Sequence, residues 1–373
     1  MRVTDLPNGN TESPATIAQP GASHKRSPFA FILISACLFG LSVPFSKALL
    51  DDVPAIPLAG LLYLGAFGGL SLYSVARRSI GSSSGSKPPP LDRKDIPWLA
   101  GATISGGIVA PVSLMLGLSL MSGFSTSLLL NLEGVATAVI AVFVFKENAG
   151  KNLWIALLFM TAAGVLLGWN PGKGEFDIVG IGLIVLAMVC WGIDNNLTRM
   201  ICTKDAVQIT QVKGLAAGVA ILAAATAIGE DITLGLSLAL ALIVGALTYG
   251  ASLVLFIRSL ERLGSLRTGA FYSLGPFVGA AVSVIVLGEW LGWLMFPAAA
   301  LMALGAWLIL AERHDHHHTH EANTHDHLHD HCDDHHMHGH FGAFHEPHSH
   351  EHVHLSTTHD HIHRPDSHHR HEH

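Results

Sequence analysis

Charged residues are scarce in this chain of 373 residues. Asp, Glu, Lys and Arg make up 13% of it, about half of the roughly 25% that is typical of soluble domains. Apolar residues supply 50% of the sequence, and the mean hydropathy is +0.43. Uncharged runs of membrane length are spread along residues 28–311, which excludes an ordinary soluble fold. The composition therefore predicts an all-α membrane protein that crosses the bilayer many times.

Other absences narrow the chemistry. The four cysteines show no pairing pattern, so no disulfide framework is expected. No histidine occurs between residues 28 and 313, which leaves the predicted spans without the commonest transition-metal ligand. Nothing in this region resembles a nucleophile–base pair, a phosphate-binding loop or a closed metal site. We therefore predict that the protein is not an enzyme, requires no cofactor and binds no nucleic acid.

The apolar segments predict ten transmembrane helices. Residues 96–132 carry no charge over 37 positions, which is too long for one crossing and suits two crossings joined by a short turn. A basic linker rich in Gly, Ser and Pro, residues 77–95, precedes them. The predicted spans are 28–46, 56–76, about 96–118, 124–145, 152–169, 178–196, 211–229, 234–257, 268–288 and 290–310.

Four regions follow from this division. Residues 1–27 are polar and predict a disordered cytoplasmic leader. Residues 28–170 and 178–312 each contain five predicted spans, and residues 313–373 form a tail that we expect to be disordered. Residues 312–373 hold twelve Asp and Glu against three Arg, a charge of −9, so the remainder of the chain carries +2. The tail and the membrane region therefore have different chemistry.

The distribution of basic residues predicts the orientation in the membrane. With a cytoplasmic N-terminus, sixteen Lys and Arg in flanks and loops, Lys213 among them, fall on the cytoplasmic side. Only Lys47 and Lys173 fall on the opposite side. Because cytoplasmic loops carry an excess of Lys and Arg, this asymmetry predicts an inner-membrane protein with both termini in the cytoplasm.

The chain repeats itself. When segments 127–147 and 271–289 are aligned on their closing glutamates, Glu147 and Glu289, residues 131–134 fall on residues 273–276. Residues 39–47 likewise align with residues 191–199. An odd number of spans in each half forces the halves into opposite orientations, as in transporters whose substrate site lies between inverted repeats near the midplane.

This paired pattern resembles the EamA-type members of the drug/metabolite transporter superfamily. The matching residues are Phe39-Gly40…Lys47, Trp191-Gly192…Arg199, Tyr272-Ser273-Leu274-Gly275-Pro276-Phe277 and Leu287-Gly288-Glu289, within residues 28–312. The resemblance implies ten helices in two inverted repeats and secondary transport, commonly export of amino acids, metabolites or drugs. The sequence departs from the family pattern at Gly134, where the counterpart of Pro276 is expected, and Glu133 is not part of that pattern.

Glu133 is an ionisable residue inside the fourth predicted span. It lies twelve residues before Phe145, or about 18 Å from the end of the helix and near the bilayer midplane. One hypothesis is that Glu133 loads and releases a proton, or binds a cation, as access alternates. The alternative is a structural carboxylic acid that stays protonated and hydrogen-bonded to a neighbouring helix. Asn131, on a different helical face, is a candidate polar neighbour of the cavity.

The remaining site candidates each have a structural alternative. Asp194 and Asn195 are candidates for the pathway, although exposure at the cytoplasmic interface competes with that reading. Ser42 is weaker, and aromatic residues within spans more often serve packing. The further candidates are Trp191 and Tyr272 for the pathway, Pro44 and Pro276 as hinges, and Glu147 and Glu289 as structural residues at helix ends.

Histidine is concentrated in the tail, where 25 occur from His314 to His373. Neutral imidazole is a good ligand for Zn, Ni and Co, and the interleaved Asp and Glu add oxygen ligands. In an extended segment, residues i and i+2 project to one side, so two imidazoles can converge on one ion. The candidate metal ligands are His314, His316, His317, His318, His320, His325, His327, His329, His331, Cys332, His335 and His336.

Two transport hypotheses and one alternative class are compatible with these features. The favoured one is a proton-coupled exporter of a small organic metabolite or amino acid, with a regulatory or buffering tail. The second is a divalent-metal exporter whose tail collects Ni, Co or Zn. The third is a metal buffer or sensor without transport. The expected partners are the small-molecule or ion substrate and the lipid bilayer, with the protein a monomer or homodimer.

Overall fold

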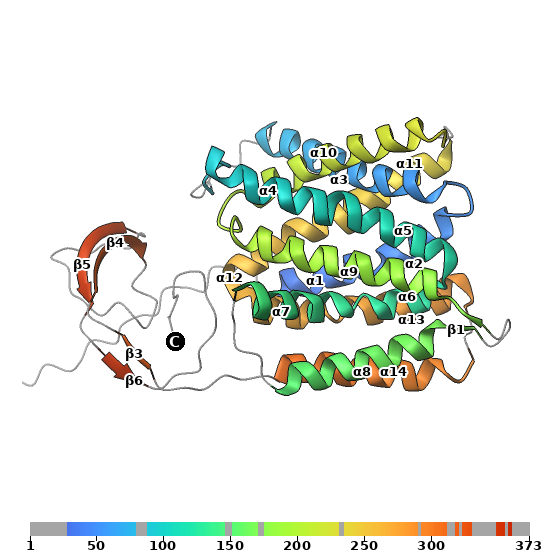
Figure 1. Ribbon diagram of the computed structural model, residues 1–373. Helices are drawn as coiled ribbons and strands as arrows, with labels where there is room; N and C mark the ends of the chain where they lie inside the picture. Colours follow the sequence, from blue (N-terminus) through green and yellow to red (C-terminus); the bar gives the residue numbers. More distant parts are fainter. Residues whose placement is uncertain are drawn as a thin grey trace, which may run out of the picture.

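The computed structural model describes residues 28–79, 88–145, 151–170, 175–230, 235–289 and 292–311, with four short stretches of the tail. The predicted leader lies outside the described residues. Figure 1 shows that the described helices run roughly along one common direction. Their bounds are α1 Pro28–Gly40, α2 Ser42–Leu49, α3 Ala55–Ser79, η1 Arg93–Asp95, α4 Ile96–Ala102, η2 Thr103–Val109, α5 Ala110–Leu120, α6 Gly123–Leu129, α7 Leu132–Phe145, α8 Lys151–Gly168, α9 Ile178–Arg199, α10 Ala206–Ala227, α11 Leu236–Val244, η3 Gly245–Ala251, α12 Ser252–Tyr272, α13 Gly275–Leu287 and α14 Met295–Ala311.

Seven helical stretches among the described residues are long and apolar enough to cross a membrane: Phe29–Leu49, Ala55–Arg77, Arg93–Leu120, Gly123–Val144, Ile178–Arg199, Ala206–Ala227 and Leu236–Leu263. Three shorter apolar helices cover Trp154–Leu167, Gly275–Leu287 and Met295–Leu308. Large apolar side chains such as Leu72, Ile285 and Trp307 lie exposed on the outside of the bundle. An apolar exterior of this extent is suited to lipid rather than water. The prediction of a helical multi-pass membrane protein is confirmed.

Several apolar stretches are interrupted in their middle. Pro44 lacks the N–H that would bond to the carbonyl of Gly40, and α1 ends at Gly40. Pro276 likewise lacks the N–H that would bond to the carbonyl of Tyr272, the last residue of α12. The break between α6 and α7 contains no proline. There two backbone N–H groups bond to carbonyls three residues back instead of four: Asn131 N to Leu128 O at 3.1 Å, and Glu133 N to Leu130 O at 3.0 Å.

Two stretches adopt π-helical geometry. They are η2, between α4 and α5, and η3, between α11 and α12. A π-helical turn inserts extra backbone into a helix and shifts the carbonyls out of their usual α-helical bonds, which is why such turns recur at functional sites. Both lie beside the cavity described below.

The range of α12 contains a reversal of the chain. Its first residue, Ser252, bonds to Ser35, while the Arg262 guanidinium lies over the Phe31 ring and Phe271 packs on Phe29. A straight helix would place residues 252 and 271 about 29 Å apart, yet their partners lie on two turns of α1. The chain therefore turns back after Arg262, in the region that the sequence predicted as a loop between two spans.

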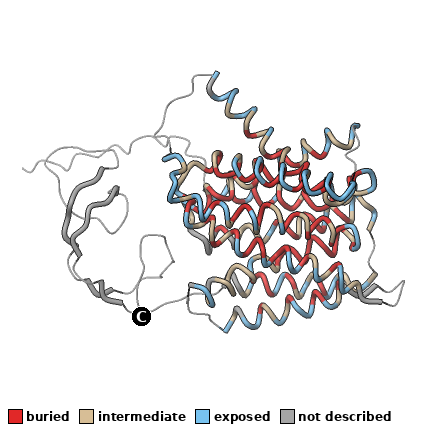
Figure 2. The backbone as a smooth tube through the Cα atoms, turned by 45° about the horizontal axis from the view of Figure 1, so that its top comes forward, coloured by how far each residue is buried: buried red, intermediate tan, exposed pale blue. Residues whose placement is uncertain are grey.

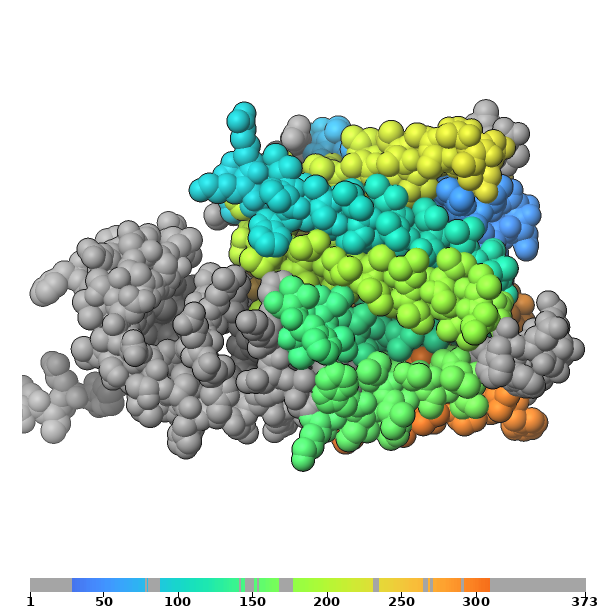
Figure 3. Space-filling model, in the orientation of Figure 1, coloured from blue at the N-terminus to red at the C-terminus, as the bar shows by residue number. Residues whose placement is uncertain are grey.

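The bundle has a densely packed centre and a peripheral pair of helices. Buried positions are concentrated in the central helices, and α8 and α14 lie together at one edge (Figures 1 and 2). On the face seen in Figure 3, the side chains of α9 fill the space between α5 and α7. Gly65 lets α3 approach the backbone of Leu242 in α11, because a Cβ there would overlap the Leu242 carbonyl.

Loops and helix ends define the two faces of the bundle. On one, Lys204 pairs with Asp95 at 3.3 Å and Asp205 N donates to Pro89 O at 3.1 Å. We call this the 200–205 face; α14 also ends there (Figure 1). On the opposite face the Glu289 carboxylate accepts from the N–H groups of Gly123 and Phe124, at 2.7 and 2.8 Å. Glu289 therefore joins the end of α13 to the start of α6 and closes this side of the bundle.

Short strands occur outside the helices. Strands β1 Trp169–Asn170 and β2 Glu175–Phe176 form a small antiparallel pair between α8 and α9. In the tail, β3 His318–His320 pairs with β6 Thr357–His359, and β4 Asn323–His329 with β5 His348–His354, both antiparallel. At these four stretches the backbone is extended and paired, whereas the sequence predicted no regular structure. The other tail residues lie outside the described part of the chain.

Candidate functional site

A cavity lies inside the bundle, between helices from both halves of the chain. Asp194 on α9 is about 8 Å along the helix from Arg199, at the 200–205 face. Lys213 lies in the second turn of α10, so the cavity is nearer this face than the Glu289 face. The lining residues come from α1, α3, α7, α9, α10, η3 and α12: Phe39, Tyr63, Ala66, Glu133, Trp191, Asp194, Asn195, Thr210, Lys213, Gly214, Thr248, Tyr249, Ser252, Leu253, Phe256 and Tyr272.

Glu133 forms one wall of this cavity. It is the second residue of α7, just after the break that follows α6. Asn195 Nδ2 donates to Glu133 Oε1 at 2.8 Å and to Thr137 Oγ1 at 3.3 Å. Among the ion pairs of the described residues, none involves Glu133. Its carboxyl group therefore faces the cavity with an amide partner and without a basic one.

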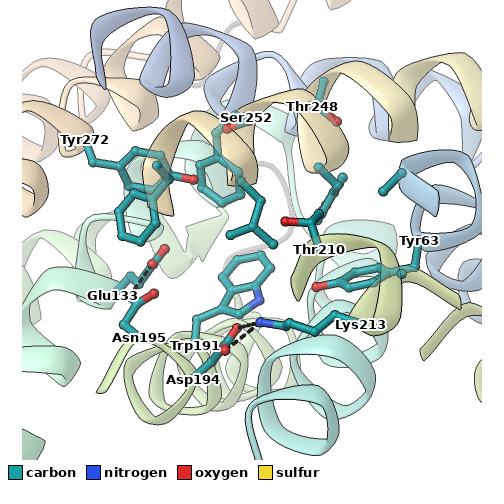
Figure 4. Close-up of a pocket in the computed structure, with 16 residues that line it drawn as sticks. Tyr63, Glu133, Trp191, Asp194, Asn195, Thr210, Lys213, Thr248, Ser252 and Tyr272 are labelled. Carbon is teal, nitrogen blue, oxygen red and sulfur yellow. Dashed lines mark hydrogen bonds and ion pairs between the residues drawn. The ribbon is translucent and has the colours of Figure 1, made fainter. Parts of the chain in front are cut away.

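Asp194 and Lys213 form a buried ion pair on another wall. The Lys213 ammonium lies 2.6 Å from Asp194 Oδ1 and 2.7 Å from Oδ2, and the Lys213 side chain is 1% exposed. Thr198 Oγ1 also donates to Asp194 Oδ1, at 2.8 Å. In Figure 4 this pair lies below Trp191, while Glu133 and Asn195 lie to its left. Successive residues on a helix are about 100° apart, which explains how Asp194 faces α10 while Asn195 faces α7.

The carbonyl of Gly106 in η2 connects three helices. It accepts from Tyr63 Oη on α3 at 2.6 Å and from Trp191 Nε1 on α9 at 2.9 Å. The π-helical geometry of η2 leaves this oxygen accessible to side chains. A Cβ at position 106 would overlap the carboxyl group of Asp194, so glycine is required for this approach. Gly106 therefore supports the orientation of both Trp191 and the Asp194–Lys213 pair.

Aromatic rings form much of the cavity lining. Phe39 stacks on Tyr272 with centroids 5.1 Å apart and meets Trp191 edge-on at 5.5 Å. Phe256 contacts Tyr272 at 4.7 Å, and Tyr249 lies 6.3 Å from Phe39. The same cavity thus offers π faces beside one carboxyl group, Glu133, which is an arrangement suited to an organic ligand with a polar or cationic end.

The structure brings together five of the seven residues predicted for the pathway: Glu133, Asp194, Asn195, Trp191 and Tyr272 line the cavity. Asp194 is buried, at 6% exposure, rather than exposed at the interface. The other two are buried outside the lining. Asn131 Nδ2 donates to Leu128 O at 3.1 Å and so belongs to the break between α6 and α7, and Ser42 is the first residue of α2.

The predicted hinge and helix-end residues occupy structural positions. Pro44 and Pro276 each follow a break in their helix, and Glu289 caps α6. Glu147 lies outside the described residues, as do His314, His316, His317, His331, Cys332, His335 and His336. Only the backbone is described for His318, His320, His325, His327 and His329. Among the described residues no group of three or more His, Cys, Asp and Glu is arranged to hold a metal ion.

Sequence reasoning missed Lys213 and placed it in a cytoplasmic flank. The seventh span was predicted at about 211–229, with Lys213 near its cytoplasmic end, but α10 begins at Ala206. Lys213 is therefore about 11 Å inside the helix. Two features of the sequence were available as signals: Asp205, which caps α10 by accepting from Val207 N at 2.9 Å, and the presence of an acid on the neighbouring span, Asp194.

The fold and the cavity define a multi-pass membrane protein with a site between its helices that combines charged and aromatic side chains. Residues 27–169 and 178–311 each match the model of the EamA-like transporter family. The chain therefore belongs to the EamA-like transporter family, as the resemblance predicted, and is a membrane transporter.

Two individual proteins are similar to the chain. An uncharacterized transporter of Methanothermobacter thermautotrophicus is 22% identical over 274 residues, which is 69% of this chain and 78% of that protein. A protein of known crystal structure aligns with a TM-score of 0.56 and 17% identity, covering 76% of this chain and 96% of the other. At this identity the structural likeness concerns the fold alone.

Proposed function

We propose that the protein is a secondary transporter of the cell (inner) membrane that exports a small organic metabolite or amino acid by alternating access. In this proposal a proton exchanges with the substrate at Glu133. The observation that carries it is the position of the Glu133 carboxyl group in the wall of a cavity between the helices, held by Asn195 and without a basic partner among the described residues. An ionisable group inside a membrane bundle marks a transport pathway by default.

We further propose that all ten apolar helical segments cross the membrane, as two inverted five-helix repeats. The two stretches matched by the family model each hold five of these segments. The π-helical segments support an internal repeat, because Thr103 and Gly245 are separated by 142 residues, the same offset as Glu147 and Glu289. At this offset the α6–α7 break also corresponds to the α12–α13 break, although Gly134 replaces the proline of Pro276. Inverted repeats place the substrate site at their interface.

The tail is proposed to bind Zn, Ni or Co in a regulatory or buffering role, with both termini cytoplasmic. The tail backbone sets His325 opposite His352, His327 opposite His350 and His329 opposite His348. Directly opposed residues of an antiparallel pair are close enough for two imidazoles to share one ion. The membrane region works in this proposal as a monomer or homodimer, and the tail is not part of its substrate site.

Proton movement in liposomes tests the proposed function. The full-length protein is reconstituted with a pH-sensitive dye inside, and phenylalanine, phenethylamine or Ni²⁺ is added outside. The expected result is a change of internal pH with at least one organic compound, which disappears in Glu133→Gln. Glu261→Gln is the matched control, since Glu261 is an acid of α12 outside the cavity lining.

Three results would contradict the proposal. If Glu133→Gln moves protons as well as the natural protein does, Glu133 is a structural acid. If only Ni²⁺ produces a signal, and cellular Ni falls when the protein is expressed, the protein is a divalent-metal exporter. If no organic compound and no metal produces a signal above empty liposomes, the proposed proton-coupled transport is wrong.

A further inference from the structure

The charged residues in the cavity restrict the charge of the ligand, which family membership alone does not. The lining holds three residues with ordinarily charged side chains: Glu133, Asp194 and Lys213. Lys213 contacts both carboxylate oxygens of Asp194, so these two charges cancel within the wall. When Glu133 is ionised, the lining therefore carries one net negative charge, and that charge is located at Glu133.

The surroundings of the Asp194–Lys213 ion pair oppose its dissociation. Both partners are buried, at 6% and 1% exposure, and Thr198 provides a third hydrogen bond to Asp194. Breaking a buried pair leaves an uncompensated charge in a medium of low dielectric constant, which is strongly unfavourable. A ligand that needed Lys213 for its own carboxylate would have to displace Asp194 from both contacts. Lys213 is thus occupied and does not serve as a free anion-binding group.

The same pair disfavours a doubly charged ligand. A divalent cation would need Glu133 and Asp194 together, but Asp194 is neutralised by an ammonium that would repel the ion. Transition metals also favour imidazole or thiolate ligands, and the lining contains no His or Cys. The aromatic faces of Phe39, Trp191 and Tyr272 beside Glu133 instead match a single cationic group attached to an apolar body.

We propose that the Asp194–Lys213 pair sets the charge of the substrate, so that the cavity selects a monovalent organic amine with an apolar or aromatic body. Its ammonium binds Glu133, and its body lies against the aromatic rings. Lys213 is a specificity-determining residue in this proposal, and it acts by neutralising Asp194. The proposal rests on the proposed function and narrows its substrate.

Ligand binding to the full-length protein in detergent tests whether the cavity selects a ligand with a single positive charge, which we call the charge rule. The probes are phenethylamine, with one positive charge, phenylalanine, a zwitterion with the same ring, 1,4-diaminobutane, with two positive charges, and Ni²⁺. Ni²⁺ binding is measured on protein lacking residues 314–373, with the unfolding transition of that truncated form checked first. We expect phenethylamine to bind at least tenfold more tightly than any other probe, and Glu133→Gln to abolish this preference.

Paired variants separate neutralisation from direct contact. The double variant Asp194→Asn/Lys213→Met removes both charges and leaves the net charge at Glu133 unchanged. It should still bind phenethylamine more tightly than phenylalanine, 1,4-diaminobutane or Ni²⁺, because the remaining charge is unchanged. The single variant Asp194→Asn leaves the Lys213 charge in the cavity and should weaken phenethylamine binding more than tenfold. The unfolding transition of each variant is measured in the same detergent, and Asn196→Ser serves as a matched change on α9 outside the lining.

Several outcomes would overturn the proposal. If phenylalanine binds more tightly than phenethylamine, and the double variant no longer binds phenylalanine, Lys213 contacts a substrate carboxylate directly. Preferential binding of 1,4-diaminobutane or Ni²⁺ would exclude a site for a single charge, and so would a lack of binding by every probe. If phenylalanine moves protons through Glu133 in liposomes, the proposed transport function stands and the charge rule alone is wrong. If the double variant is unfolded, the separate result of Glu133→Gln with the four probes still decides the charge rule.

Discussion

Replacing Gly106 by alanine should destabilise the protein strongly for so small a change. Gly106 lies in η2, where its carbonyl accepts from Tyr63 at 2.6 Å and Trp191 at 2.9 Å. The added Cβ would overlap the carboxyl group of Asp194. Asp194 is itself held by Lys213 and Thr198, so it has little freedom to move aside. The expected response is a shift of η2 away from α9, which separates Gly106 O from both donors.

The magnitude follows from the contacts that are lost. Two hydrogen bonds contribute about 1 kcal/mol each, and forcing an extra methyl group into a packed interior costs about 1–3 kcal/mol. Gly106→Ala should therefore lower the free energy of unfolding by about 3–5 kcal/mol. It should also impair ligand binding, because Trp191 and Asp194 both lie in the cavity wall.

Unfolding by SDS titration in mixed micelles, followed by far-UV circular dichroism, measures this change. Two other glycines serve as controls. At Gly134 an added Cβ meets nothing within 4 Å, and at Gly107 it comes within 3.1 Å of the Ala217 methyl group. Gly134→Ala should change stability by less than about 1 kcal/mol, with Gly107→Ala between the two. If Gly106→Ala unfolds within about 1 kcal/mol of Gly134→Ala, the role assigned to the Gly106 carbonyl is wrong.

Three further predictions concern other parts of the chain. Glu289→Ala removes the acceptor for two N–H groups at the start of α6. It should lower the free energy of unfolding by about 1–2 kcal/mol in the same titration, and Glu289→Gln should lower it less. Equal stability of both variants and the natural protein would show that Glu289 does not stabilise α6. Burial, and secondarily Glu261, raise the pKa of the Cys202 thiol. Because only the thiolate reacts, a protein with Cys202 as its sole cysteine should react with a water-soluble maleimide more slowly than free cysteine and gain rate at more alkaline pH, whereas an identical pH profile would contradict the burial of Cys202. Deletion of residues 314–373 should leave the unfolding transition unchanged and reduce the Zn or Ni bound per chain, and a loss of stability would show that the membrane region depends on the tail.

Much of the helical framework is predictable because the membrane imposes simple rules. A bilayer-spanning segment must be apolar and helical, so the positions of the long uncharged runs give the helices to within a few residues. Proline adds the breaks, since α1 ends at Gly40 and α12 at Tyr272, four residues before Pro44 and Pro276. Glu133 stood out for the same reason, as an acid inside an apolar run. These features depend on local chemistry and need no knowledge of neighbouring helices.

The tertiary structure decided which polar groups meet. Asp194 and Lys213 are nineteen residues apart on two helices, and nothing local to either residue indicates that they form a pair. The hydropathy pattern likewise does not predict the π-helical turn at Gly106 or its two side-chain donors. Both depend on how α3, η2 and α9 pack against one another. The sequence by itself thus determined the class of protein, most of its helices and one acid in the membrane. Packing determined the charge of the cavity, because neutralisation of a buried carboxylate depends on contacts a few ångströms long, and the way two helices pack decides whether such contacts form.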